Sequence, residues 1–139
     1  MHCHHSPADR LDILDLYGRY AHTIDSGDFD AWSACFQESG RLHIPARRVD
    51  ARGPGELQAF GMAFRAQTGG RQRHLFVNIQ LTRDGADMRG RCNLVMVIGG
   101  SDRPAPTLAS TGWYDDLVVR DAGGWLFAER VLHIDSPTW

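Results

Sequence analysis

The chain has 139 residues, of which 42% are hydrophobic and 23% are charged, as in an ordinary globular protein. This length favours a single domain over residues 1–139 with a substantial core. The formal net charge of -2 excludes the basic surface of a nucleic-acid-binding protein, and no apolar run approaches the about 20 residues that span a membrane. All 15 basic residues are arginine, which excludes Schiff-base and other lysine-dependent mechanisms.

The N-terminal segment over residues 1–7 is expected to be flexible, and it lacks the apolar core of a signal peptide. A cytoplasmic protein is therefore expected. The His-Cys-His-His cluster at residues 2–5 could bind a stray metal ion, although a frayed terminus is the simpler interpretation. The scattered cysteines predict neither a disulfide framework nor a structural zinc site: Cys3, Cys35 and Cys92. We expect no metal and no cofactor.

Helical signals dominate the first half of the chain. Ser6 is a good N-cap, Pro7 suits the first helical position, and apolar residues then recur at helical spacing to a stop near residues 25–27. Asp28 can cap a short second helix that runs to Phe36. After these two helices, the pattern predicts a short strand at 40–44, a loop at 47–55 and a third helix at 56–68.

From residue 74 the hydrophobic period changes to two, which indicates β-strands. The first strand is predicted to place its apolar residues on one face: Leu75, Val77, Ile79 and Leu81. Further strands are predicted at 88–98, 108–119 and 125–134. This order predicts an α+β fold, a cone-shaped barrel in which three N-terminal helices pack on a curved, mainly antiparallel sheet of four to six strands.

Three side chains could together perform general acid–base chemistry without a metal or cofactor: Tyr20, Asp25 and His74. Tyr20 and Asp25 lie about 140° apart around an ideal helix, so they meet in one cavity only if the chain turns Asp25 inward. Each also has a structural interpretation, because Asp25 could cap the helix, Tyr20 could belong to the apolar stripe and His74 could be a hydrogen-bonded strand residue. We expect Asp25 to lie within hydrogen-bond reach of His74, directly or through one water. If Asp25 accepts the second N–H of the histidine, this bond fixes the tautomer and raises the basicity of His74.

The order of elements, opened by DRLDILDLYGRYAHTIDSGDFDAW and closed by GWLFAER, resembles the SnoaL-like branch of the nuclear transport factor two-like superfamily. The resemblance covers residues 8–135. That superfamily includes dehydratases, ketosteroid isomerases, polyketide cyclases, epoxide hydrolases and non-catalytic subunits, so the fold alone does not settle an activity.

The resemblance also implies roles for particular residues. Tyr20 and Asp25 match the tyrosine and aspartate of the dehydratase members, and His74, in RHLFVNI, matches their pocket histidine. Arg130 matches a frequent arginine of the last strand. The second pocket histidine of scytalone dehydratase-like enzymes has no counterpart on the strand at 88–98, where Asn93 is the nearest polar residue.

The sequence and the resemblance together favour a cofactor-independent lyase, a dehydratase that acts on a hydroxylated cyclic carbonyl compound of polyketide, steroid or terpenoid type. The substrate-binding residues are expected to be Trp32, Phe36, Phe60, Phe76, Asn93, Met96, Trp113 and Arg130. An isomerase or cyclase that uses the same base for enolisation is the nearest alternative. A non-catalytic binding module, like the small subunits of ring-hydroxylating oxygenases, is the alternative of a different class.

The expected partners are a small hydrophobic substrate with a hydroxyl or carbonyl group and further copies of the same chain, with no nucleic acid and no membrane. A homodimer or higher homo-oligomer is expected to form through the outer sheet face, because helices cover only the other face. Asp115 and Asp116 could imitate a catalytic carboxylate pair, but neighbours on a strand point to opposite faces.

Overall fold

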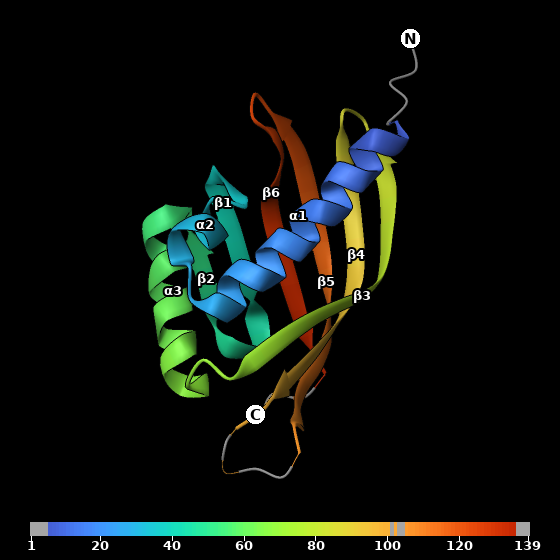
Figure 1. Ribbon diagram of the computed structural model, residues 1–139. Coiled ribbons are helices and arrows are strands. Elements are labelled where there is room, and N and C mark those ends of the chain that lie inside the picture. The colour runs from blue at the N-terminus through green and yellow to red at the C-terminus, as the bar shows by residue number, and fades with distance from the viewer. Residues whose placement is uncertain (1–5, 101, 103–104, 136–139) are drawn as a thin grey trace.

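The computed structural model describes residues 6–100, 102 and 105–135. These residues form helices α1 (Pro7–Ser26), α2 (Phe29–Ser33) and α3 (Gly53–Thr68), a short 3-10 turn η1 (Pro45–Arg47), and strands β1 (Phe36–Ile44), β2 (Val49–Arg52), β3 (Gln72–Asp84), β4 (Asp87–Ile98), β5 (Thr107–Asp121) and β6 (Gly124–Ile134). The helices lie on one face of a curved sheet, and α1 crosses that face diagonally (Figure 1). The predicted α+β fold with helices packed on a mainly antiparallel sheet is therefore confirmed.

In the described part of the chain, the strands form one six-stranded sheet in the order β2-β1-β6-β5-β4-β3. Neighbouring strands are antiparallel except β1 and β6, which run parallel with Leu42 opposite Arg130. The prediction of a loop at 47–55 was wrong, because β2 pairs with β1 and places Ala51 opposite Leu42. Four residues are too few for a period of two to be distinguished from irregular chain.

The two ends of α1 follow their predicted caps. The Ser6 hydroxyl accepts a hydrogen bond from the Asp9 backbone N–H at 3.2 Å, and the Asp9 carboxylate accepts one from the Ser6 N–H at 3.1 Å. Gly27 ends the helix with a left-handed backbone at φ 78°. Ser6 and Pro7 are thus part of the helix start rather than of a flexible segment, whereas the cluster at residues 2–5 lies outside the described residues.

The second helix is capped as predicted but is shorter. The Asp28 carboxylate accepts a hydrogen bond from the Ala31 N–H at 3.2 Å. The helix ends at Ser33, and Phe36, which was predicted to lie at its end, begins β1 instead.

A β-bulge divides β3 into two parts with opposite facing patterns. Asn78 adopts a left-handed backbone at φ 58°, and the register with β4 shifts between Val77 and Gln80. Before the bulge, Leu75 and Val77 are exposed; after it, Ile79 packs against the core. The predicted single apolar face of Leu75, Val77, Ile79 and Leu81 was therefore wrong, because the inserted residue reverses the alternation.

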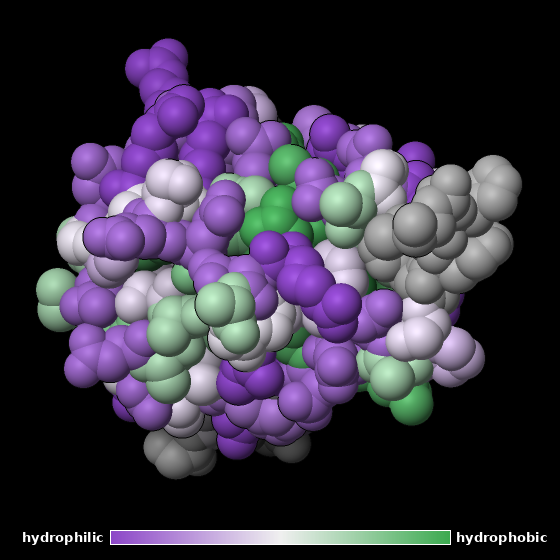
Figure 2. Space-filling model, turned by 90° about the horizontal axis from the view of Figure 1, so that it is seen from above, coloured by the Kyte–Doolittle hydropathy of each residue, from purple (hydrophilic) through white to green (hydrophobic). Residues whose placement is uncertain are grey.

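The core lies between the helices and the inner face of the sheet. Side chains from α1, β4, β5 and β6 are fully or nearly fully buried there, among them Ile13, Leu16, Leu94, Val118 and Phe127. The end of the molecule seen from above is covered mainly by hydrophilic residues, with hydrophobic residues visible in a narrow central area (Figure 2). Among the described helices, none combines the length and apolar character that crossing a membrane requires.

Candidate active site

Asp25 and His74 form a closely bonded pair at the end of α1. His74 Nδ1 lies 2.6 Å from one carboxylate oxygen of Asp25, and the His74 backbone N–H donates to the other oxygen at 2.9 Å. The Asp25 side chain is only 6% exposed to solvent, and the His74 side chain only 9%. Because the carboxylate accepts at Nδ1, that nitrogen carries the proton and Nε2 is left as the basic nitrogen. The expected contact between Asp25 and His74 is present.

Neighbouring hydrogen bonds fix the segment that carries this pair. Gln72, at the start of β3, is fully buried. Its side-chain amide donates to the Ile24 carbonyl oxygen at 3.5 Å, and its carbonyl oxygen accepts from the Thr68 hydroxyl at 2.5 Å. The end of α3, the end of α1 and the start of β3 are therefore tied together next to Asp25, and Figure 1 shows β3 passing beside the last turn of α1.

A small inner chamber lies beside the histidine. His74 lines it together with two tyrosines, Tyr20 from α1 and Tyr114 from β5, and the rest of its wall is apolar. Its volume is about 20 Å³, which is room for about one water molecule. We call this space the chamber. It brings Tyr20 and His74 to one place, with Asp25 behind the histidine.

Both chamber tyrosines are held in the protonated form. Burial raises the pKa of Tyr20 to about 12, although the charge of nearby Arg130 opposes this shift. Burial raises the pKa of Tyr114 well above its ordinary value, and the neighbouring Tyr20 adds to the effect. At neutral pH the two phenols can therefore donate hydrogen bonds to an oxygen atom in the chamber.

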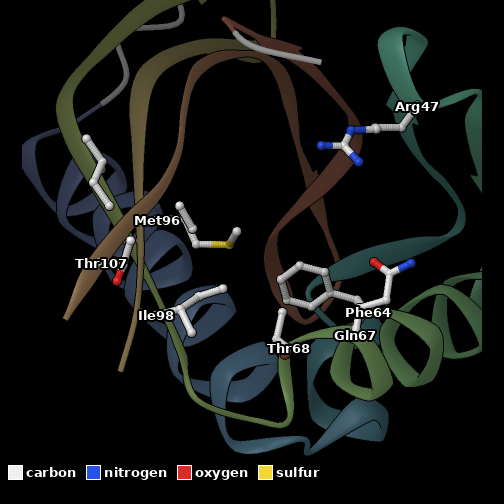
Figure 3. Close-up of a pocket in the computed structure, with 9 residues that line it drawn as sticks. Arg47, Phe64, Gln67, Thr68, Met96, Ile98 and Thr107 are labelled. Carbon is white, nitrogen blue, oxygen red and sulfur yellow. The ribbon is translucent and has the colours of Figure 1, made fainter. Parts of the chain in front are cut away.

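A larger pocket opens next to the chamber. Its volume is about 570 Å³, within the range of roughly 300–1,000 Å³ that small-molecule sites occupy. Phe64 and Met96 line both spaces, so the two are neighbours. We call the larger pocket the vestibule. Figure 3 shows Phe64 and Met96 on its walls and the Arg47 guanidinium extending into it.

A second buried pair lies deeper in the core. Arg130 and Asp116 are both 0% exposed and are joined by two hydrogen bonds, from Nε at 2.8 Å and from Nη2 at 3.1 Å. The Tyr17 hydroxyl donates to the same carboxylate at 2.6 Å. The guanidinium carbon also lies 3.8 Å from the ring centroid of Tyr114 and 4.5 Å from that of Tyr20. The Arg130 guanidinium therefore packs against the rings of both chamber tyrosines and helps to hold them in place.

Three of the predicted substrate-binding residues line the chamber: Trp32, Phe60 and Met96. Phe36 and Phe76 form the next layer, with ring centroids 5.8 Å and 5.5 Å from that of Tyr20. Arg130 lies in this buried layer too, where it is bonded to Asp116.

Asn93 and Trp113 do not lie in the pocket, and their prediction as substrate-binding residues is corrected. The two residues are paired across β4 and β5 on the outer face of the sheet. Asn93 is exposed, and the Trp113 ring stacks on His133 at 4.2 Å between centroids. Their neighbours Cys92 and Tyr114 point into the core instead, so the alternation of the strand places Asn93 and Trp113 outside.

Sequence reasoning missed Tyr114 and Arg47 as pocket residues, and it set Asp116 aside. Tyr114 and Asp116 share the inward face of β5 because they are two positions apart, and that alternation was the available signal. Arg47 carried no such signal, because its segment was expected to be a loop. Within residues 6–100, 102 and 105–135, no group of three or more His, Cys, Asp or Glu side chains could hold a metal ion.

Comparison with known proteins gives one family match, in which the sequence model described as a SnoaL-like domain matches residues 6–131. A protein of unknown function from Mycobacterium tuberculosis is 27% identical, with a TM-score of 0.83 over 94% of this chain and 78% of the other. A Catenulispora acidiphila protein solved in complex with S-DNPA is 22% identical, with a TM-score of 0.83 over 94% and 96% of the chains. A proposed scytalone dehydratase from Novosphingobium aromaticivorans is 18% identical, with a TM-score of 0.76 over 93% and 85%. The sequence matches no curated protein.

Proposed function

This chain belongs to the SnoaL-like domain family, and we propose that it is a cofactor-independent dehydratase that eliminates water from a hydroxylated cyclic carbonyl compound. One observation carries the proposal: the Asp25 carboxylate binds the side chain and the backbone of His74, and His74 shares the chamber with Tyr20. A base with a fixed tautomer beside a protonated phenol is the minimum that such a reaction needs.

Tyr20, His74 and Asp25 have separate roles in the proposed proton transfers. The Tyr20 hydroxyl donates a hydrogen bond to the substrate carbonyl oxygen and stabilises the negative charge that develops there. His74 Nε2 takes the proton from the carbon next to the carbonyl, and Asp25 stabilises the imidazolium that forms. The carbon–oxygen bond of the substrate hydroxyl then breaks as that oxygen takes the proton back from His74. The products are water and a conjugated carbonyl compound, and the enzyme returns to its starting state.

The substrate ring reaches these groups through the vestibule. Because the chamber holds about one water molecule, the Phe64 side chain must move aside before a ring can lie against Tyr20 and His74. Phe64 lines both spaces and stacks on Phe60, with ring centroids 6.1 Å apart. A small residue at position 64 should therefore ease access to the chamber.

The proposal is tested with a panel of cyclic β-hydroxy ketones in heavy water. Elimination is followed by the ultraviolet absorbance of the conjugated product, and proton abstraction by deuterium incorporation next to the carbonyl. Tyr20→Phe keeps the ring and removes only the hydroxyl, so it should slow both readouts while the variant stays folded. Deuterium incorporation without elimination would favour an isomerase or cyclase that uses the same residues.

A non-catalytic binding module is the second candidate, and the small volume of the chamber favours it. A protein that binds the panel compounds but neither eliminates water nor exchanges deuterium would establish that candidate and end the dehydratase proposal.

The proposed quaternary structure is a homodimer formed through the outer sheet face. That face carries exposed apolar side chains on β3, where Leu75 is 42% and Val77 37% exposed. Sedimentation at micromolar concentration should give the mass of a dimer, and a monomer under those conditions would contradict the proposal.

A further inference from the structure

We propose that Tyr114 is a second hydrogen-bond donor of the chamber, that its hydroxyl binds the same ligand oxygen atom as the hydroxyl of Tyr20, and that this oxygen is anionic. The chamber is then a binding site for an enolate or phenolate oxygen. The binding claim stands on the chamber itself. The claim that Tyr114 is a catalytic residue, which shares with Tyr20 the negative charge on the substrate oxygen, rests on the proposed dehydratase function.

The sheet directs Tyr114 toward the chamber. Tyr114 on β5 is paired with Cys92 of β4 on one side and with Leu132 of β6 on the other, and all three side chains are buried on the inner face. Tyr114 and Tyr20 both line the chamber, whose volume is about 20 Å³. Two phenols from different elements therefore face a space that holds about one water molecule, so both can reach the same oxygen atom.

The two phenol rings pack against the same neighbours. The centroid of the Phe76 ring lies 5.4 Å from that of Tyr114 and 5.5 Å from that of Tyr20. The Arg130 guanidinium carbon lies 3.8 Å and 4.5 Å from the same two centroids. Donors that are fixed before a ligand binds need little rearrangement when negative charge develops on the ligand oxygen. The shared packing therefore prepares the two phenols to act as a pair.

The polar groups of the chamber favour an oxygen that accepts hydrogen bonds. Of the described residues that line it, four have a polar nitrogen or oxygen in the side chain, and none of the four is a carboxylate: Tyr20, Trp32, His74 and Tyr114. In the described part of the chain, the buried Trp32 Nε1–H has no acceptor at hydrogen-bonding geometry, yet it lies near enough to the Tyr20 hydroxyl to lower the pKa of that group. One N–H and two O–H donors thus accompany a single acceptor nitrogen, Nε2 of His74. This excess of donors suits an anionic oxygen.

The charges around the chamber allow the ligand oxygen, rather than a phenol, to carry the negative charge. Burial raises the pKa of Tyr20 to about 12 and that of Tyr114 well above its ordinary value, so both phenols keep their protons. The next cause of the Tyr114 shift is the charge of Tyr20, which indicates that the two oxygens lie close together. The charge of Arg130 opposes the rise in both pKa values, and the opposite effect of Asp116 is smaller. The field in this region therefore attracts a bound anion.

Two probes of the same shape test this inference without any turnover. 4-Nitrophenol has a hydroxyl that ionises to a coloured phenolate, and 4-nitrotoluene has a methyl group in its place. Quenching of tryptophan fluorescence measures the binding of each probe, and absorbance measures the ionisation of bound nitrophenol. The wild-type protein should bind the phenolate more tightly than nitrotoluene and should lower the pKa of the bound nitrophenol below its value in water. Tyr114→Phe should weaken phenolate binding about 10–100-fold and leave nitrotoluene binding unchanged.

Tyr17→Phe is the matched control. Tyr17 also packs on Arg130, with 5.1 Å between the guanidinium carbon and the ring centroid, but it does not line the chamber. Its hydroxyl donates to Asp116, so Tyr17→Phe should lower the midpoint of thermal unfolding and leave phenolate binding unchanged.

A second measurement needs no variant of Tyr114. The chain has three tyrosines, so tyrosine labelled with ¹³C at the hydroxyl-bearing carbon gives three NMR signals. Phenolate binding to the wild-type protein should shift the signals of Tyr20 and Tyr114 and leave that of Tyr17 in place. This experiment tests the shared oxygen site even if Tyr114→Phe does not fold.

Three results would overturn the inference: a wild-type protein that binds the phenolate no better than nitrotoluene, a shift of only one tyrosine signal, and a folded Tyr114→Phe variant that keeps its phenolate affinity. None of these results ends the dehydratase proposal, which needs only Tyr20, His74 and Asp25.

The catalytic role of Tyr114 has a separate readout. Tyr114→Phe should slow deuterium incorporation next to the substrate carbonyl about 10²–10³-fold, as expected for the loss of one donor to a developing oxygen anion. Unchanged deuterium incorporation in this variant would refute the catalytic role. If the wild-type protein binds the phenolate through Tyr114 but neither eliminates water nor exchanges deuterium, the oxygen site stands and the dehydratase proposal ends.

Discussion

Asp25 and Asp116 are both buried aspartates bonded to a basic side chain, yet only one of the two pairs faces a cavity. Asp25 holds His74 at the chamber wall. Asp116 holds Arg130 in the interior, where both residues are 0% exposed and aromatic rings surround the guanidinium. The first pair contains an imidazole, a group that can accept and release a proton, and the second contains a guanidinium, which stays charged.

The difference separates a group that can do chemistry from one that supports structure. An imidazole beside a cavity can exchange a proton with a ligand, and its aspartate adjusts that exchange. A guanidinium enclosed among rings keeps its charge and positions the tyrosines packed on it. Changes to the first pair should therefore appear in turnover and changes to the second in stability.

The largest expected effect follows from removal of the base. His74→Ala should lower turnover by about 10²–10⁴-fold, because the imidazole performs the proton transfer. The matched control is His133→Ala, which removes a histidine from the outer sheet face, where it stacks on Trp113. Steady-state kinetics on both variants checks the prediction. Equal rates for the two variants, with both folded, would show that His74 is not the base.

Asp116→Asn should have the next largest effect, on the free energy of unfolding. The substitution keeps the shape of the side chain but leaves the Arg130 charge buried without its counter-charge, which should destabilise the protein by about 3–5 kcal/mol. Asp115→Asn alters the exposed neighbour on β5 and should change stability by less than about 0.5 kcal/mol. Urea denaturation measures both. Comparable values for the two variants would refute the structural role of the buried pair.

Asp25→Asn should have a smaller effect on turnover than His74→Ala. The amide cannot stabilise the imidazolium as a carboxylate does, and loss of one hydrogen bond between charged groups corresponds to about a 10–100-fold fall in kcat. The fall should appear in kcat rather than in KM, because Asp25 does not line the chamber. A variant with unchanged kcat would reduce Asp25 to a helix-terminal structural residue.

A further prediction concerns the pH dependence of the tyrosines, all three of which lie in the described part of the chain. Burial raises the pKa of Tyr20 to about 12, and the pKa values of Tyr17 and Tyr114 are raised as well, whereas unfolded tyrosine ionises near about pH 10. The resulting stability is complete below about pH 10 and is lost as the pH rises toward 12. Tyrosinate absorbance should therefore rise near pH 10 in urea and only at higher pH in the folded protein. A normal titration of the folded protein would show that the phenols contact solvent.

The sequence predicts most of the fold because most elements carry a complete local signal. The caps of α1 and the alternation of buried and exposed residues in β4 to β6 can be recognised without reference to the rest of the molecule. The bulge at Asn78 could not be predicted, because asparagine in a strand pattern is compatible with regular and left-handed backbone alike. β2 was missed because its pairing with β1, rather than its own four residues, makes it a strand.

The residues of the candidate site also include some that the sequence could predict and some that it could not. Tyr20, Asp25 and His74 could be selected because their residue types suit acid–base chemistry and their positions match a known family. Asn93 was placed in the pocket as the nearest polar residue on the strand that lacks the second histidine, and Trp113 as part of an apolar wall. The facing of each strand, however, depends on pairing that only the tertiary structure fixes. Arg47 lies on a turn, where no periodicity indicates which way a side chain points.

The parallel pairing of β1 with β6 has a consequence for the order of folding. β6 lies between β1 and β5, so β2 and β1 join β5, β4 and β3 only after β6 is in place. Phe36 must meet Phe127 across a long stretch of chain, and contacts of such large sequence separation slow folding. During synthesis on the ribosome, we therefore expect helices and hairpins to form before β6 is available. Until then, β1 of the β2-β1 pair and β5 of the β5-β4-β3 group each keep an unpaired edge. A chain shortened before β6 would leave those edges exposed and would be expected to aggregate rather than fold.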